Sequence, residues 1–150
     1  MRPLIVTEFV SLDGVMEAPG GEPGYAHSGW VGDYFSDELG QFKGEEQEAA
    51  ETLLLGRRTY EGFYGAWPTR TGAMADKINS MEKYVVSASL PTIEWETASR
   101  LGSPLPDAVT ELKNREGGPI LVAGSRTLAQ ALLLEGLVDE LHLQVFPVIL

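Results

Sequence analysis

The sequence contains no cysteine, and only two of its 150 residues are histidines, His27 and His142. The chain therefore has no disulfide, no thiolate metal site and no cysteine nucleophile. With so few imidazoles, zinc hydrolysis and a histidine-dependent catalytic triad are disfavoured. We expect no metal centre.

Basic residues are also scarce, because 11 lysines and arginines face 22 acidic residues and give a net charge of −11. Such a surface repels nucleic acid and anionic lipid over most of its area, so we expect no nucleic-acid or membrane partner. An anionic ligand would need a locally basic region on this acidic surface. Three of the seven arginines follow apolar strand-like runs and could form such a region: Arg57, Arg58 and Arg126.

Long hydrophobic runs are absent as well. No apolar segment approaches the roughly 18 to 20 residues that a membrane helix requires. Thr7 and Glu8 stand where a secretory signal would continue its apolar stretch, so we expect a cytoplasmic protein. The length and a hydrophobic content of 43% predict one globular domain over residues 1–150.

Apolar runs and amphipathic segments alternate along the chain and predict strands and helices in turn. The expected strands are Leu4–Phe9, Thr52–Leu55, Lys83–Val86, Pro119–Val122 and Glu140–Val148. The expected helices are 33 or 36 to about 51, interrupted by Gly40 and Gly44, then Thr59–Phe63, Met74–Met81, Asp107–Arg115 and Ser125–Glu135. This alternation predicts a three-layer α/β sandwich, a mostly parallel sheet with helices on both faces.

Two predicted strand-to-helix corners carry glycine and arginine. At Gly56-Arg57-Arg58-Thr59 and at Gly124-Ser125-Arg126-Thr127 a buried strand ends and a helix begins at once. A helix N-terminus binds phosphate through its free N–H groups and positive dipole end, and arginine adds bidentate donors. Both corners can face the carboxyl edge of one parallel sheet and hold opposite parts of one elongated anion. The alternative is two structural corners with solvated arginines.

The dinucleotide fingerprint G-x-G-x-x-G and the loop G-x-x-x-x-G-K-[ST] are both missing, which disfavours a Rossmann dehydrogenase and a P-loop nucleotidase. Between the first strand and the first helix lies a long segment with Pro19-Gly20-Gly21-Glu22-Pro23-Gly24. A connection of this length in a small domain more often covers a site than merely links elements.

Several short motifs occur in a specific order over nearly the whole chain. They are Ser11-Leu12-Asp13-Gly14, Leu55-Gly56-Arg57-Arg58-Thr59-Tyr60-Glu61, Val86-Ser87-Ala88-Ser89, Val122-Ala123-Gly124-Ser125 and Leu137-Val138-Asp139-Glu140-Leu141 leading to Pro147. With them the sequence resembles the dihydrofolate reductase-like superfamily. It is most similar to the bacterial branch that includes the C-terminal reductase domain of the bifunctional riboflavin-biosynthesis deaminase/reductase.

The resemblance implies NADPH as cofactor and hydride transfer to a small pteridine- or pyrimidine-type heterocycle, either dihydrofolate-like or ribosylaminouracil-like. Carried over to this chain, the cofactor-binding residues are Gly56, Arg57, Arg58, Thr59, Ser87, Ala88, Ser89, Gly124, Ser125, Arg126, Thr127 and Leu128. Either arginine of the first corner, or a hydroxyl near Ser87, would favour the 2′-phosphate, so we expect NADPH over NADH. Where the family has a second consecutive glycine this chain has Ser125, which implies a backbone angle unfavourable for serine or a shifted turn.

The resemblance also implies that the loop from Ser11 to about Trp30 closes over the nicotinamide. Asp13 is then the candidate catalytic carboxylate, either orienting or proton-donating, although an Asp-Gly pair is also a plain turn signal. Trp30, Phe35, Tyr64 and Trp67 are candidates to stack on the substrate, with core packing as the alternative. Folate-reducing members carry a carboxylate early in the first helix. Here Asp37 and Glu38 both lie near that position, but neither matches it in register, so the sequence does not decide whether the substrate is a folate.

The sequence ends in the apolar segment Val148-Ile149-Leu150, without the closing hairpin of the family, so we expect either a fragment or a short member. An apolar strand edge and the habit of the family predict a homodimer. The alternative to a reductase is a non-catalytic NADPH-binding sensor or dimeric scaffold on the same fold. A third reading is an unrelated acidic α/β protein.

Overall fold

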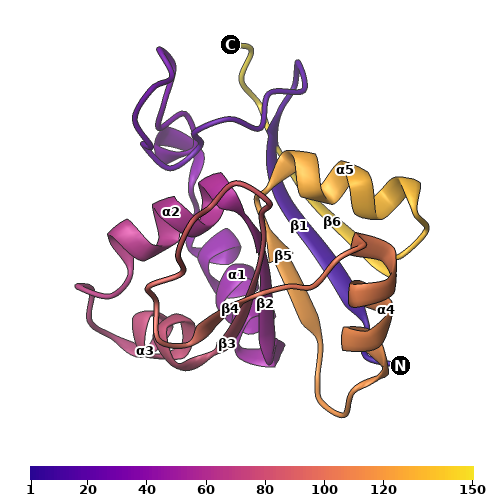
Figure 1. Ribbon diagram of the computed structural model, residues 1–150. Coiled ribbons are helices and arrows are strands. Elements are labelled where there is room, and N and C mark those ends of the chain that lie inside the picture. The colour runs from indigo at the N-terminus through magenta and orange to yellow at the C-terminus, as the bar shows by residue number, and fades with distance from the viewer.

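Strands and helices alternate along the chain as the sequence predicts (Figure 1). A computed structural model describes residues 1–150. The strands are β1 (Leu4–Ser11), β2 (Thr52–Gly56), β3 (Glu82–Val86), β4 (Ala98–Arg100), β5 (Ile120–Ala123) and β6 (Glu140–Phe146). The helices are α1 (Asp37–Ala49), α2 (Arg57–Ala66), α3 (Ala73–Ser80), α4 (Leu105–Asn114) and α5 (Arg126–Leu134), with a 3-10 turn at Gly32–Tyr34.

All six strands are parallel, in the order β4-β3-β2-β5-β1-β6, which confirms the predicted sheet. The pairing between β2 and β5 is short, since only Thr52 and Leu53 have register partners in β5. From these two strands the chain leaves in opposite directions, toward β3 and toward β6. The carboxyl ends of β2 and β5 therefore form a topological switch point, where ligands of open α/β sheets bind.

Helices cover both faces of the sheet, as predicted. One face packs against α4 and α5 in a cluster that includes Val6, Val122 and Leu132, all fully buried. The other face packs against α2 and α3 in a cluster that includes Leu55 and Ile78. The helix α1 lies beside α3 on this second face. The structure thus has the three layers of the predicted α/β sandwich.

The structure departs from the predicted elements in several places. Gly40 and Gly44 do not interrupt α1, because a glycine costs a helix only about 1 kcal/mol and the Ser36 side chain caps the N-terminus by accepting a hydrogen bond from Leu39 N at 3.1 Å. The short edge strand β4 was not predicted. The strand β6 ends at Phe146, before Pro147, rather than at Val148. None of the helices has both the length and the apolar character needed to cross a membrane.

The long connection between β1 and α1 lies beyond the carboxyl edge of the sheet, next to the C-terminal segment (Figure 1). It is held by its own hydrogen bonds, among them Gly29 N to Ala18 O at 2.9 Å and Trp30 Nε1 to Glu17 O at 2.9 Å. Leu12 N also donates to Val148 O at 3.0 Å. The loop from Ser11 to about Trp30 thus lies at the edge of the sheet where the resemblance implies that it closes over the nicotinamide.

Candidate cofactor and substrate site

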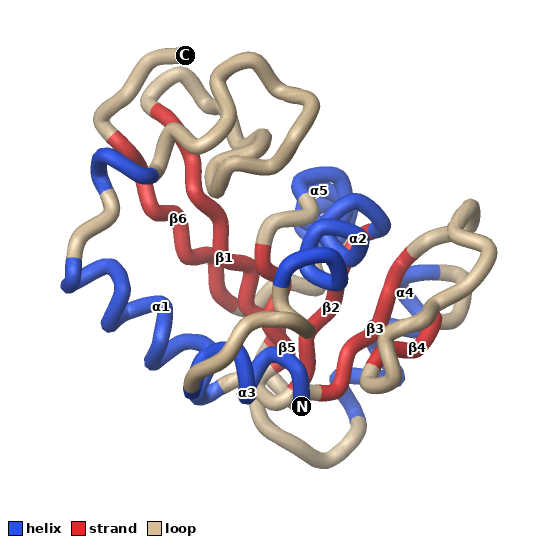
Figure 2. The backbone as a smooth tube through the Cα atoms, turned by 90° about the vertical axis from the view of Figure 1, so that its left-hand side faces the viewer, coloured by secondary structure: helices blue, strands red, loops and turns tan.

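The two predicted corners lie side by side at the switch point (Figure 2). Gly56 N, at the end of β2, donates to the Ser125 hydroxyl at 2.9 Å. A Cβ atom added to Gly124 would contact the Thr59 side chain at 3.5 Å, so the two turns approach closely. The N-termini of α2 and α5 are therefore neighbours, although 69 residues separate Gly56 from Ser125.

The backbone at the second corner is left-handed over two residues. Gly124 has φ +66° and Ser125 has φ +60° and ψ 52°. This confirms the first of the two expectations for Ser125, namely an angle that serine tolerates less well than glycine. No side chain caps the N-terminus of α2 or of α5. The first N–H groups of both helices are thus left to bind an anion.

The structure separates the two adjacent arginines by their contacts. Arg57 donates to the Ser89 hydroxyl at 2.9 Å and to the Glu61 carboxylate at 3.0 Å, so its charge already has a partner. Arg58 is exposed and makes no ion pair or hydrogen bond with the protein. Arg126, at the start of α5, is exposed and unpaired in the same way. Arg58 and Arg126 are consequently the cations best placed to meet a phosphate.

Ser87, Ala88 and Ser89 follow the end of β3, the strand next to β2. The Ser87 hydroxyl accepts hydrogen bonds from Ser89 N at 3.3 Å and Leu90 N at 3.0 Å, and Arg100 donates to the carbonyl oxygen of Ser87. The segment is thereby fixed as a turn at the same edge. All three cofactor segments predicted from the sequence thus follow the carboxyl ends of three consecutive strands of the sheet, β3, β2 and β5.

Asp13 lies in the turn after β1. Its carboxylate accepts a hydrogen bond from the Ser11 hydroxyl at 2.6 Å and another from Leu150 N at 3.1 Å. The Ser11 hydrogen bond lowers the pKa of this exposed carboxyl below its ordinary value. Asp13 is therefore ionised near neutral pH, which favours an orienting role over proton donation. Its catalytic role remains a prediction.

The aromatic residues expected at the substrate are not gathered in one place. Trp30 is buried, and its ring centroid lies 5.5 Å from that of Phe146. Phe35 is 49% exposed and meets Phe9 edge-on at 6.5 Å. Tyr64 stacks on another tyrosine of α2 and meets the tilted ring of Trp95 at 5.7 Å, away from Phe9 and Phe35. Trp67, the fourth candidate, lies 6.3 Å from the Phe63 ring, so Phe35 offers the most exposed ring near β1.

The two carboxylates considered for a folate-type site, Asp37 and Glu38, are exposed in the first turn of α1 and make no ion pair or side-chain hydrogen bond. The charged residues of α1 that contact the sheet are instead Lys43 and Glu46. The sequence of α1 alone does not indicate that Lys43 and Glu46 contact the sheet, because their partners in β1 and β6 lie tens of residues away in the sequence.

Glu8 was also missed as a functional candidate. It stands in β1 with 4% of its surface exposed, and one of its carboxylate oxygens is buried without a hydrogen bond. Burial raises its pKa to about 7, and Lys43 offsets part of this effect. The signal in the sequence that could have indicated it is a charged residue within the otherwise apolar run Leu4–Val10.

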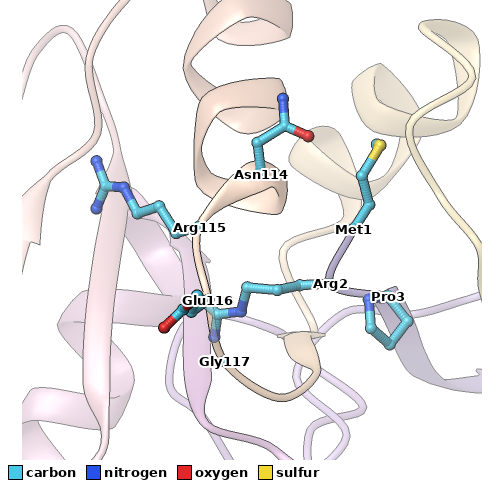
Figure 3. A pocket seen from close by; sticks show the side chains of 7 residues that line it. All are labelled: Met1, Arg2, Pro3, Asn114, Arg115, Glu116 and Gly117. Carbon is cyan, nitrogen blue, oxygen red and sulfur yellow. The ribbon is translucent and has the colours of Figure 1, made fainter.

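A cavity of about 300 Å³ lies at the opposite edge of the sheet, between the start of β1 and the end of α4 (Figure 3). It is lined by Met1, Arg2, Pro3, Asn114, Arg115, Glu116 and Gly117. The Arg2 side chain runs toward Glu116, whereas that of Arg115 points away. This cavity is open and mostly polar, and it is remote from the strand ends where both corners lie.

Comparison with known proteins decides the family. The family model of the RibD C-terminal domain matches residues 2–150. The chain belongs to this family. The crystal structure of a "Putative riboflavin biosynthesis protein" from Shewanella sp. PV-4 superposes with a TM-score of 0.69, at 20% sequence identity over 99% of this chain and 78% of that one. A search of curated proteins finds no match. The fold is dihydrofolate reductase-like, and membership in the RibD C-terminal family supports a reductase-type enzyme.

Proposed function

We propose that this RibD C-terminal domain is an NADPH-dependent reductase of a small pteridine- or pyrimidine-type heterocycle. The observation that carries the proposal is the pair of uncapped helix N-termini, joined by the 2.9 Å contact between Gly56 and Ser125 and flanked by the unpaired Arg58 and Arg126. This arrangement suits the pyrophosphate and the 2′-phosphate of the dinucleotide. When bound, the cofactor supplies the hydride.

The order of the strands suggests how the dinucleotide lies. The adenosine end would meet Ser87–Ser89 after β3, with Arg57 holding Ser89 in place and Arg58 near the 2′-phosphate. The nicotinamide end then points the other way along the sheet edge, toward β1 and the loop that begins at Asp13. The loop would exclude water from the reacting atoms. We further propose that the enzyme acts in the cytoplasm as a homodimer.

Removal of Arg58 tests the cofactor site. We expect Arg58→Ala to weaken NADPH binding about tenfold and NADH binding much less, because a lost charge-assisted hydrogen bond costs about 1.5 kcal/mol. The measurement is a fluorescence titration of the purified protein with each cofactor. Arg70→Ala is the matched control, since Arg70 is also exposed but lies beyond α2, over the Trp67 ring.

Equal affinity of the unchanged protein for the two cofactors would contradict the NADPH preference, and no binding of either would contradict the reductase. The decay of NADPH absorbance with dihydrofolate or other heterocyclic acceptors then tests turnover. Binding without turnover of any acceptor would favour the alternative, a non-catalytic NADPH-binding sensor or dimeric scaffold.

A further inference from the structure

The cavity between the start of β1 and the end of α4 has no part in the proposed function (Figure 3). Its volume of about 300 Å³ is at the lower end of the range for ligand sites, so it suits a small molecule. Only one of its seven lining residues is hydrophobic, which favours a ligand with charged or hydrogen-bonding groups. Both corners lie at the opposite edge of the sheet, so a ligand in this cavity is separate from the proposed cofactor.

The guanidinium group of Arg2 is the buried charge of this cavity. Only 6% of the residue is exposed, and it forms no ion pair, although the chain has 22 acidic residues. Its Nε donates to Gly118 O at 2.7 Å and its Nη2 to Thr52 Oγ1 at 2.7 Å. The N–H groups of Nη1 have no partner in the protein, and they are not enclosed, so a ligand in the cavity can reach them. A buried cation is normally paired, so this one favours the binding of an anionic group.

The Arg2 side chain is held in place before any ligand binds. Its backbone N donates to Lys113 O at 2.8 Å. The Thr52 hydroxyl that accepts from Nη2 donates in turn to the Glu82 carboxylate at 3.3 Å. The backbone of Gly117, with φ +137°, passes so close that an added Cβ atom would lie 3.1 Å from Arg2 Cζ. Because glycine allows this approach, the turn encloses the guanidinium and its unpaired donors are preorganised.

Glu116 brings the opposite charge to the same cavity. Its side chain is exposed and makes no ion pair or hydrogen bond, although Arg2 runs toward it (Figure 3). The carboxylate of Glu51 lies against the backbone of Gly117 and likewise forms no ion pair with Arg2. These two carboxylates would repel a simple anion bound to Arg2. They would attract a ligand that carries a cationic group next to its anionic one.

We propose that this cavity binds a small zwitterion of the α-amino acid type, with its carboxylate on Arg2 and its ammonium group on Glu116. The planar guanidinium matches the geometry of a carboxylate. An amino acid carries both charged groups on one carbon atom, so it can bridge two side chains that approach each other without pairing. It also adds no net charge to a protein that already carries −11.

Three probes of similar size test this proposal. L-alanine carries both charged groups, propionate lacks the ammonium group, and ethylamine lacks the carboxylate. Each probe is titrated into isotope-labelled protein, and the amide chemical shifts of Gly117 and Gly118 are followed by NMR spectroscopy. We expect L-alanine to shift both amides saturably, with a dissociation constant on the order of millimolar. Propionate should bind roughly fivefold more weakly, and ethylamine should give no saturable shift.

The preference for the zwitterion should depend on Glu116. We expect Glu116→Gln to weaken L-alanine binding roughly fivefold without weakening propionate binding, so that the two affinities become nearly equal. Arg2→Lys keeps the charge but loses the fork, and it should weaken both probes. Glu135→Gln is the matched control, since Glu135 is also exposed but lies at the end of α5, outside the cavity. Circular dichroism checks the fold, and Glu116→Gln carries the test if Arg2→Lys does not fold.

An alanine-to-propionate affinity ratio that is the same in Glu116→Gln and in the unchanged protein would overturn the proposal. So would the absence of saturable shifts with L-alanine, or equal binding of L-alanine and propionate by the unchanged protein. Saturating NADP⁺ should leave the affinity for L-alanine unchanged, because the two sites lie at opposite edges of the sheet. Competition between the two would place L-alanine at the corners and would also overturn the proposal.

Discussion

Glu8 shows how a single residue can bring pH dependence into the fold. Its carboxyl group is buried in β1, the strand next to the edge strand β6, and one of its oxygens has no hydrogen-bond partner, so the charged form has lost water and Lys43 compensates for this only in part. Burial raises its pKa from 4.5 to about 7. Between pH 4.5 and about pH 7, Glu8 keeps its proton in the folded protein but loses it in the unfolded chain. The contribution of Glu8 to stability is therefore greatest below pH 4.5 and is lost as the pH rises through 7.

We predict that Glu8→Gln removes this dependence. The difference in the free energy of unfolding between variant and unchanged protein should be near zero at pH 4.5 and should reach roughly 3 kcal/mol in favour of the variant at pH 8. Urea unfolding at several pH values measures it. The raised pKa of His142 acts in the same direction, but it is common to both proteins and cancels in the difference. A difference that stays constant with pH would contradict the prediction.

Ser125 combines an unfavourable backbone angle with a favourable contact. A left-handed serine costs roughly 1 to 2 kcal/mol, and its hydroxyl accepts the 2.9 Å hydrogen bond from Gly56 N. The side chain therefore bridges β2 and β5 beyond the point where their pairing ends.

Two substitutions separate these effects. We expect Ser125→Ala to destabilise the fold by about 1 to 2 kcal/mol, because the strain stays and Gly56 N loses its partner. Ser125→Gly should be nearly neutral, because it loses the same hydrogen bond but relieves the strain. Urea unfolding of both variants tests this. Equal losses for alanine and glycine would show that the backbone angle carries no strain.

At the scale of elements, the sequence alone predicts those strands and turns whose signal lies in neighbouring residues. The apolar runs before Gly56 and Gly124 predict buried parallel strands, and the arginines directly behind them predict the two corners at the carboxyl edge. These features depend on neighbouring residues and on the general rule that parallel strands end at the same edge. Strand order and the contact between the corners were not predictable in detail, because both depend on which faces pack together.

Elements with little local signal were missed. The strand β4 is only Ala98–Arg100, with one apolar residue, and it forms because the edge of β3 is available for pairing. Lys43 and Thr7 are 36 residues apart, and their contact depends on how α1 crosses the sheet. For the same reason the sequence offered four aromatic candidates for the substrate but gave no indication of which would lie near β1.

At the scale of the whole molecule, the two corners are a locally basic region of a strongly acidic protein. The net charge of −11 disfavours an anionic dinucleotide at long range, and this repulsion is screened within about 10 Å at 0.1 M salt. Binding of the proposed cofactor would therefore depend on contacts at the two corners, where Arg58 and Arg126 have no competing carboxylate partner. The corners also belong to opposite helical layers, with α2 on one face of the sheet and α5 on the other.

Because β2 and β5 pair at only two positions, a ligand that spans α2 and α5 would join the two halves of the sheet. We predict that NADPH at about 100 times its dissociation constant adds roughly 2.7 kcal/mol to the free energy of unfolding, which raises the melting temperature by roughly 5 to 10 °C for a chain of this length. Differential scanning calorimetry measures the shift. At the same NADPH concentration Arg58→Ala should retain about half of it, because a tenfold weaker site leaves roughly 1.4 kcal/mol. A shift as large in Arg58→Ala as in Arg70→Ala would mean that the dinucleotide stabilises the protein from some other surface.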